Sequence, residues 1–261
     1  MRSLRFAVAA GIAAMFATTA MASPVQPKNG AEYTTLAPAQ PAEAVGKKIE
    51  VIEFFAYHCP ACNLMEPTVA QWVKRHADDV TFKRIAFPFH GAADPEAHLW
   101  VTLDAMGKSE EYGPKVFHAF HVEHQRLITD EAVLEWVGKS GLDKAKFTGY
   151  WNSFGVLTKL RRLPQLVATY KIDGTPTFVV DGKYVTSPGA VGQANPTIAN
   201  PDVAAAAATT LDSLVAMAMK KKGYTGAPAP AAPAAHTGSS TPAAGAAHAA
   251  PAAAAKKTAH K

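Results

Sequence analysis

The sequence predicts an α/β domain into which a group of helices is inserted. Residues 49–89 have the pattern of a strand, a helix and a second strand, and residues 177–222 that of a hairpin followed by a final helix. Between them, residues 95–170 are helical in pattern and too long for a simple crossover. We therefore expect these helices to form a small subdomain of their own.

The first strand leads directly into a helix that begins beside the two cysteines. Residues 49–57 read IEVIEFFAY, an apolar run typical of a strand buried on both faces. Pro60 suits a first helical turn, where its missing N–H has no intrahelical partner. Apolar side chains then recur at helical spacing at Leu64, Met65, Val69, Trp72 and Val73. We expect Cys59 at the N-terminus of this helix.

Further changes of pattern give the remaining boundaries. Residues 80–89 indicate a second strand parallel to the first, and the dipeptide Asp181-Gly182 is a strong hairpin signal. The predicted segments are an N-terminal extension at 23–48, an α/β domain at 49–91 and 166–225, and an inserted helical subdomain at 92–165. Breaks in the helical region are expected near Gly113-Pro114, Ser140-Gly141 and Gly155, with a helix start at Thr129 and Asp130.

Both ends of the chain differ in composition from the predicted domain. Residues 1–22 have the basic, apolar and small-residue order of a secretory signal peptide, with an uncleaved membrane anchor as the alternative. We expect no later segment to be long and apolar enough to span a membrane, and hence an exported, soluble protein. Residues 226–261 are mostly Ala and Pro, which predicts a disordered tail or spacer. Its three histidines lack the spacing of metal ligands.

The charge of the chain lies mainly at its ends. The formal net charge is +5. Two arginines precede residue 23 and three lysines follow residue 225, where there are no acids, so residues 23–225 are neutral overall. A neutral domain has no electrostatic footprint for polyphosphate, and we expect no nucleic-acid partner.

The chain has two cysteines, Cys59 and Cys62. An exported protein normally uses disulfides to close long loops, because those constrain the unfolded chain most. A bridge across two residues closes almost no loop, so this spacing favours redox chemistry. The alternatives are a merely structural bridge, or half of a zinc site whose other ligands are not evident in the sequence.

A CxxC pair at a helix start has a defined chemistry. The free N–H groups and the positive end of the helix dipole stabilise a thiolate at Cys59. A stabilised thiolate is a good leaving group, which makes the disulfide a stronger oxidant. We expect a substrate thiolate to attack Cys59 and displace Cys62, with Pro60 and Ala61 shaping the turn between them.

A second motif, Gly174-Thr175-Pro176-Thr177, precedes an apolar strand far along the chain. Proline permits a cis peptide bond at low cost. The alternative is a plain turn before the strand.

Taken in order, these motifs resemble the DsbA family of thiol:disulfide oxidoreductases. The matching segments are EFFAYHCPAC at 53–62, WNSF at 151–154, GTPTFVVDGKY at 174–184 and the closing helix. They span nearly all of residues 45–222. The resemblance implies a thioredoxin fold with an inserted all-helical subdomain.

The resemblance also implies an activity and its partners. It implies a redox-active pair at Cys59 and Cys62, and a cis peptide at Thr175-Pro176 that lies against the disulfide and leaves the Thr175 backbone free to bind peptide. It further implies a periplasmic protein that oxidises reduced exported polypeptides and is reoxidised by a quinone-linked membrane partner similar to DsbB. We expect no cofactor, no metal and a monomer.

Glu53 resembles the buried acid that lies beneath the cysteines in this family and assists proton movement. A carboxylate inside a buried strand has to be paired or protonated. Lys83 is a plausible partner, and Arg84 is the alternative because one sequence does not define strand register. Glu53 could instead face water at a strand edge.

One position departs from the family. Many members have a histidine directly before the second cysteine that helps to stabilise the thiolate, whereas this chain has Ala61 there and His58 directly before Cys59. We therefore expect Cys59 to be acidic but less so than in those members. His58 either compensates in part or is an exposed side chain that touches nothing.

Two other functions use the same residues. A disulfide isomerase or reductase would be held reduced, but isomerases of the DsbC type carry a dimerisation domain for which residues 23–48 are too short. A peptide-binding chaperone would use the apolar groove beside the cysteines. We favour the oxidant.

Overall fold

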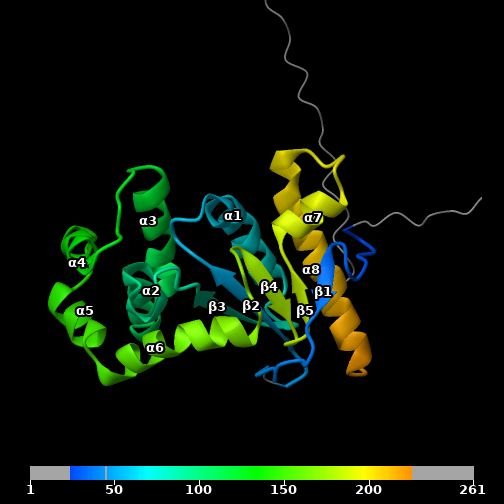
Figure 1. The fold of residues 1–261 in the computed structure, drawn as a ribbon, viewed down its shortest axis with the longest axis horizontal. Helices are drawn as coiled ribbons and strands as arrows, with labels where there is room; N and C mark the ends of the chain where they lie inside the picture. Colours follow the sequence, from blue (N-terminus) through cyan, green and yellow to red (C-terminus); the bar gives the residue numbers. More distant parts are fainter. Residues whose placement is uncertain (1–23, 45, 225–261) are drawn as a thin grey trace, which may run out of the picture. The chain divides into compact units, whose positions relative to one another are not determined.

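Five strands form one mixed sheet within residues 24–44 and 46–224, the part of the chain that the computed structural model describes (Figure 1). The strands are β1 (Tyr33–Thr35), β2 (Ile49–Phe55), β3 (Val80–Ala86), β4 (Thr177–Val180) and β5 (Tyr184–Thr186). Their order across the sheet is β1-β5-β4-β2-β3. The β2 and β3 strands are parallel, as predicted, and the other neighbours are antiparallel.

The sheet is covered on both faces by helices. The helices are α1 (Pro60–Arg75), α2 (Pro95–Ala105), α3 (Ser109–His121), α4 (Asp130–Lys139), α5 (Lys144–Trp151), α6 (Phe154–Thr169), α7 (Pro188–Ala194) and α8 (Val203–Lys221), with short 3-10 turns at Gly91–Ala93 and Asn200–Asp202. One core joins α1 and α8 to the sheet face that carries Val51 and Phe178. A second joins the end of α6 to the opposite face, which carries Ile52 and Val179. This alternation follows from the two-residue period of a strand.

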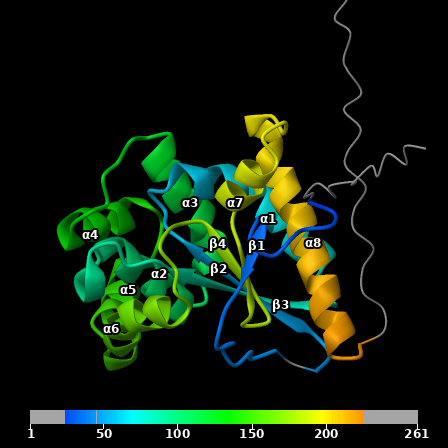
Figure 2. The ribbon, with the colours of Figure 1, turned by 45° about the vertical axis from the view of Figure 1, so that its right-hand side comes forward.

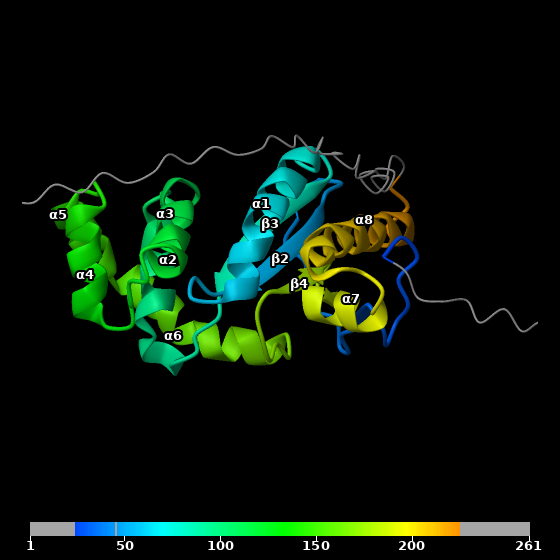
Figure 3. The ribbon, with the colours of Figure 1, turned by 90° about the horizontal axis from the view of Figure 1, so that it is seen from above.

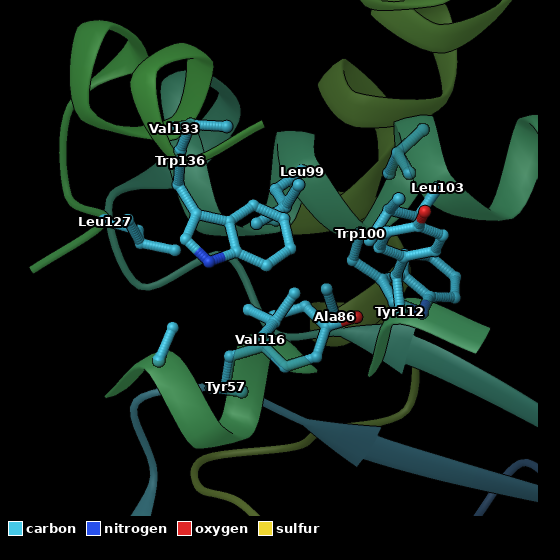
Figure 4. Close-up of a cluster of buried hydrophobic side chains, with 14 of the residues drawn as sticks. Tyr57, Ala86, Leu99, Trp100, Leu103, Tyr112, Val116, Leu127, Val133 and Trp136 are labelled. Carbon is cyan, nitrogen blue, oxygen red and sulfur yellow. The ribbon is translucent and has the colours of Figure 1, made fainter. Parts of the chain in front are cut away.

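The inserted helices form a third core together with the ends of β2 and β3 and the two cysteines. Helices α2 to α5 lie to one side of the sheet in Figures 1 and 2. Their buried side chains include Leu99, Val116, Val133 and Trp136, several of which Figure 4 shows. The predicted boundary at residue 165 lies inside α6, which continues from this group to the sheet (Figure 3).

Two of the three expected helix breaks are wrong. Gly113 and Pro114 lie inside α3, where Pro114 is on an exposed side of the second turn and its ring does not interrupt the packing. The break comes earlier, at Gly107, whose φ of 67° ends α2. Gly155 lies inside α6, because Ser153 caps that helix by accepting a hydrogen bond from Val156 N. The predicted break at Gly141 and the start at Thr129 are confirmed.

The hairpin between β4 and β5 is confirmed. Asp181 and Gly182 both have positive φ, 53° and 62°, as the favoured two-residue turn requires. A Cβ at Gly182 would overlap the Gln40 carbonyl oxygen. The glycine therefore also lets the N-terminal extension approach, and this extension adds β1, which the sequence analysis did not predict, to the sheet.

One expectation about membrane segments needs correction. Among the described residues, Asn200–Lys221 is long and apolar enough to cross a membrane. In the structure, however, this segment contains α8, which buries Leu211, Leu214 and Val215 in the core against the sheet. Its apolar character is therefore explained by packing. The predicted signal peptide and tail lie outside the described residues.

Candidate active site

The two cysteines lie at the junction of β2 and α1, as predicted. Cys59 is the N-cap residue of α1, with extended backbone angles, and Pro60 is the first helical residue. Cys62 N donates a hydrogen bond to Cys59 Sγ at 3.4 Å. Both residues are free thiols, and Cys59 is 8% exposed against 1% for Cys62. The first sulfur is therefore the one that a substrate can reach.

The surroundings of the two sulfurs shift the pKa values of Cys59 and Cys62 in opposite directions. A hydrogen bond from the Cys62 side chain, aided by the Thr175 side chain and the Cys62 and Ala61 backbone, lowers the pKa of Cys59 to about 5 despite its burial. The same sulfur contact, together with burial, raises the pKa of Cys62. At neutral pH the reduced pair therefore carries one thiolate, on Cys59, and one thiol.

This acidity gives a prediction for stability. The reduced protein is expected to become more stable, relative to the oxidised protein, as the pH rises from about 5 to about 9. The pKa of Cys59 is about 5 in the folded chain against an ordinary value of 9.0. The unfolded reduced chain therefore binds more protons within this window, and folding is favoured as the pH rises. This contribution is lost as the pH falls through 5.

Urea denaturation of both redox forms across this range measures the effect. The oxidised form is the matched control, because its disulfide has no thiol to titrate. Identical pH profiles for the two forms would contradict the acidity of Cys59.

The Thr175-Pro176 motif lies next to the CxxC pair in the folded chain. The peptide bond between Thr175 and Pro176 is cis, as the resemblance implies. Cys59 Sγ lies 3.4 Å from the Thr175 carbonyl oxygen, to which its thiol can donate, although 116 residues separate them. Thr177, which follows, begins β4 and pairs with Phe54 of β2. The motif is therefore part of the site rather than a remote turn.

Glu53 is buried beneath the site, and its partner is Arg84 rather than Lys83. Arg84 Nε donates to Glu53 Oε2 at 2.7 Å. The register pairs Glu53 with Arg84, whereas Lys83 lies opposite Ile52 and points to the other face of the sheet. There Lys83 donates to Glu50 and to Glu43 at 2.7 and 2.9 Å.

A second carboxylate, Glu66 of α1, completes this cluster. Arg84 Nη1 and Nη2 donate to its two oxygens at 3.2 and 2.7 Å. Burial raises the pKa of Glu53, and the charge of Arg84 opposes the shift. Glu53 also interacts electrostatically with Cys59 and Cys62. Glu66 was not among the predicted site residues, although its position four residues after Cys62 places both on one face of α1.

His58 is not a free surface side chain. Its backbone N–H donates to Glu96 Oε1 at 3.0 Å, and its Nδ1 lies 2.6 Å from Glu96 Oε2. The hydrogen bond to Glu96 raises the pKa of His58. Glu96 is buried in the first turn of α2, 38 residues away in the sequence, and was also missed. No local pattern connects the two residues.

Apolar side chains are exposed on three segments near the cysteines. They are Leu64 of α1, Phe89, which contacts the His58 ring, and Val122, which follows α3. A cavity of about 690 Å³ lies elsewhere, between β3 and the inserted helices, and neither cysteine lines it. Exposed apolar side chains thus lie near the N-terminus of α1, where Cys59 is the more accessible of the two cysteines. In the described part of the chain, no three His, Cys, Asp or Glu side chains are grouped to hold a metal ion.

Comparisons with known proteins agree with this site. The sequence profile of the DSBA-like thioredoxin domain matches residues 50–196. The thiol:disulfide interchange protein DsbA of Bordetella parapertussis is 40% identical over 192 residues, which cover 74% of this chain and 91% of that protein. The DsbA of Pseudomonas aeruginosa PAO1 is 34% identical, with 74% and 90% coverage. A crystal structure of Pseudomonas aeruginosa DsbA has a TM-score of 0.65 at 31% identity, covering 74% of this chain and 95% of that one.

The fold and the cysteine pair are those of a thioredoxin-fold thiol:disulfide oxidoreductase. The chain belongs to the DsbA family.

Proposed function

We propose that this oxidoreductase acts as a donor, passing the Cys59–Cys62 disulfide to reduced polypeptides that fold after export. The observation that carries the proposal is the unequal acidity of the two sulfurs. The pKa of Cys59 is lowered to about 5, and that of Cys62 is raised. Stabilising the thiolate stabilises the reduced pair, and this makes the disulfide an oxidant.

The reaction proceeds in two exchange steps. A substrate thiolate bonds to Cys59 Sγ while the bond to Cys62 breaks, and Cys62 leaves as a thiolate that takes up a proton. A second substrate thiolate then attacks the substrate sulfur of the mixed disulfide, and Cys59 leaves as a thiolate. Two electrons pass to the cysteine pair, and the substrate gains a disulfide.

The surface around the pair suits a polypeptide substrate. The exposed side chains of Leu64, Phe89 and Val122 offer apolar contacts to an unfolded chain. The cis-proline loop provides a backbone edge at Thr175 beside Cys59. We assign Cys59 and Cys62 the catalytic roles and Thr175 and Pro176 a role in peptide binding.

The donor must be reoxidised after each turnover. We propose a quinone-linked membrane oxidase of the DsbB type as the electron acceptor. The protein would work in the periplasm as a monomer, after removal of the signal peptide predicted at residues 1–22. The family of the chain supports this assignment.

The redox state of the pair in cells tests the direction of transfer. Rapid alkylation of free thiols in intact cells should find the cysteine pair mostly oxidised, because a donor accumulates as its disulfide when an oxidase recharges it. Cells without the oxidase are the control and should hold the pair reduced. A pair that is mostly reduced in wild-type cells would favour an isomerase or reductase instead.

A further inference from the structure

His58 is held in place by a single buried carboxylate. Glu96 accepts one hydrogen bond from the His58 backbone N–H and a second, at 2.6 Å, from Nδ1 of the ring. The ring also packs edge-on against Phe89, with centroids 4.8 Å apart. The position of the ring, directly before Cys59, is therefore defined by contacts on two sides.

The charged and titratable groups that act on His58 come from two elements. From α2 come Glu96 and the N-cap residue Asp94, and from the start of α1 comes Cys59. Asp94 is already engaged, because it accepts hydrogen bonds from Ala97 N at 2.8 Å and from His90 N at 2.9 Å. From α3, His121 bonds through Nε2 to the Tyr57 carbonyl oxygen rather than to the His58 ring.

The chemistry of this pair favours a charged ring. The Glu96 side chain is 10% exposed, and a carboxylate withdrawn from water is costly unless a cation or several donors compensate it. Its contact with Nδ1 raises the pKa of His58, and Cys59 raises it further. Ala61, inside the CxxC turn, has no side-chain donor. The imidazole of His58, on the residue directly before Cys59, interacts electrostatically with Cys59.

We propose that Glu96 holds His58 as an imidazolium beside Cys59, and that this cation stabilises the Cys59 thiolate in the reduced protein. His58 and Glu96 are positioning residues for the redox pair. The inference rests on the proposed function in one respect, namely that a more stable thiolate makes a stronger disulfide donor.

The arrangement couples redox state to proton binding. The oxidised pair carries no charge on sulfur, whereas the reduced pair carries a thiolate on Cys59. His58 should therefore bind its proton more tightly in the reduced protein. When a substrate dithiol is oxidised, one of its two protons goes to Cys62. The second proton goes to His58 if the imidazole of His58 is neutral. If the imidazole already carries its proton, the second proton goes to solvent.

Three variants distinguish the effect of the His58 charge from that of the Glu96 charge. His58→Gln leaves the Glu96 carboxylate beside the thiolate without its cation, Glu96→Gln removes the carboxylate, and the double variant removes both charges. His90→Gln is the matched control, because His90 also contacts a carboxylate of the α2 N-terminus through its backbone N–H and Nδ1, at Asp94.

The pKa of Cys59, measured by the ultraviolet absorbance of the thiolate, and the equilibrium with glutathione are the readouts. We expect His58→Gln to raise this pKa by about one unit, which corresponds to a tenfold weaker oxidant. Glu96→Gln should not raise this pKa, because the ring still holds its proton near pH 5 while the opposing carboxylate is gone. The double variant should fall between the unaltered protein and His58→Gln, so that removing the carboxylate partly rescues His58→Gln. His90→Gln should leave the pKa unchanged.

A measurement on the unaltered protein provides the second test. By linkage, the proton on His58 and the charge on Cys59 must shift each other's pKa equally. The sulfurs of the oxidised protein are uncharged, like a thiol. NMR titration of His58 should therefore give a higher pKa in the reduced than in the oxidised protein, by an amount similar to the rise that His58→Gln causes in the pKa of Cys59. This readout does not depend on whether a variant folds.

Two results would overturn the inference. One is a His58→Gln variant whose Cys59 pKa equals that of His90→Gln, and the other is a His58 that titrates at the same pH in both redox states. Both are measured on purified protein and do not depend on the direction of transfer in cells. A pair found reduced in cells would reject the donor function and leave this linkage standing.

Discussion

Replacement of Cys59 by serine is expected to reduce disulfide donation to the rate of uncatalysed oxidation. The variant cannot form the intramolecular disulfide. Cys62 cannot replace the lost sulfur, because it is 1% exposed and burial contributes to its raised pKa. The measurement is the rate at which a reduced, unfolded substrate protein regains activity in a glutathione buffer containing the variant. A rate close to that of the unaltered protein would point to a chaperone that binds peptides without redox chemistry.

The matched variant, Cys62→Ser, should behave differently. Cys59 remains accessible and can still form a mixed disulfide with a substrate, but no resolving thiol lies beside it. We expect covalent complexes with substrate to accumulate through Cys59, visible as larger species on gels without reductant. Complexes that form instead in Cys59→Ser would reverse the assigned roles of the two cysteines.

Replacement of Arg84 by leucine is expected to lower the free energy of unfolding at pH 7 by about 3–5 kcal/mol, the usual cost of removing one partner from a buried ion pair. Arg84 lies between the carboxylates of Glu53 and Glu66 and donates hydrogen bonds to both. Without it, Glu53 remains buried and Glu66 half-buried, with no cation beside them. Urea unfolding of the reduced variant measures the loss.

Two controls test this explanation. In Arg84→Leu the loss should shrink as the pH falls towards 5, because burial raises the pKa of Glu53, which then binds a proton more tightly in the folded than in the unfolded chain. A triple variant with Glu53→Gln, Glu66→Gln and Arg84→Leu should recover most of the stability, since it has no buried charge left in this cluster. Lys159→Leu, which breaks an exposed pair with Asp104, should cost less than about 1 kcal/mol. A triple variant as unstable as Arg84→Leu would show that packing, not charge, explains the loss.

The features that the sequence analysis predicted correctly are local ones. The position of Cys59 at the start of α1, the hairpin turn at Asp181-Gly182 and the helix start at Thr129 all depend on residues within a few positions of each other. Proline at a first helical turn, positive φ in a two-residue hairpin and a hydroxyl at an N-cap are requirements of short-range geometry. The wrong break at Gly113-Pro114 shows the limit of such rules, because tertiary packing continues the helix through them.

The resemblance to a known family connected parts of the site that are far apart in the sequence, which local rules could not do. The motif at Thr175-Pro176 could be connected to Cys59 before the structure was known only through the order of motifs in a family. Composition and periodicity by themselves do not bring together residues that are 116 positions apart. The same holds for Glu96, which no motif connects to His58.

By itself, the sequence determined that this protein has a CxxC pair at a helix N-terminus, followed by inserted helices and a hairpin. Only the tertiary structure decided which charged groups surround that pair. The choice of Arg84 over Lys83 for Glu53 depends on the register of β2 against β3. A shift of one residue moves every side chain of a strand to the opposite face. The contacts of Glu66 with Arg84 and of Glu96 with His58 depend on how α1 and α2 pack beside β3 and the cysteines. Such packing is decided by the whole core, and no short stretch of sequence contains it.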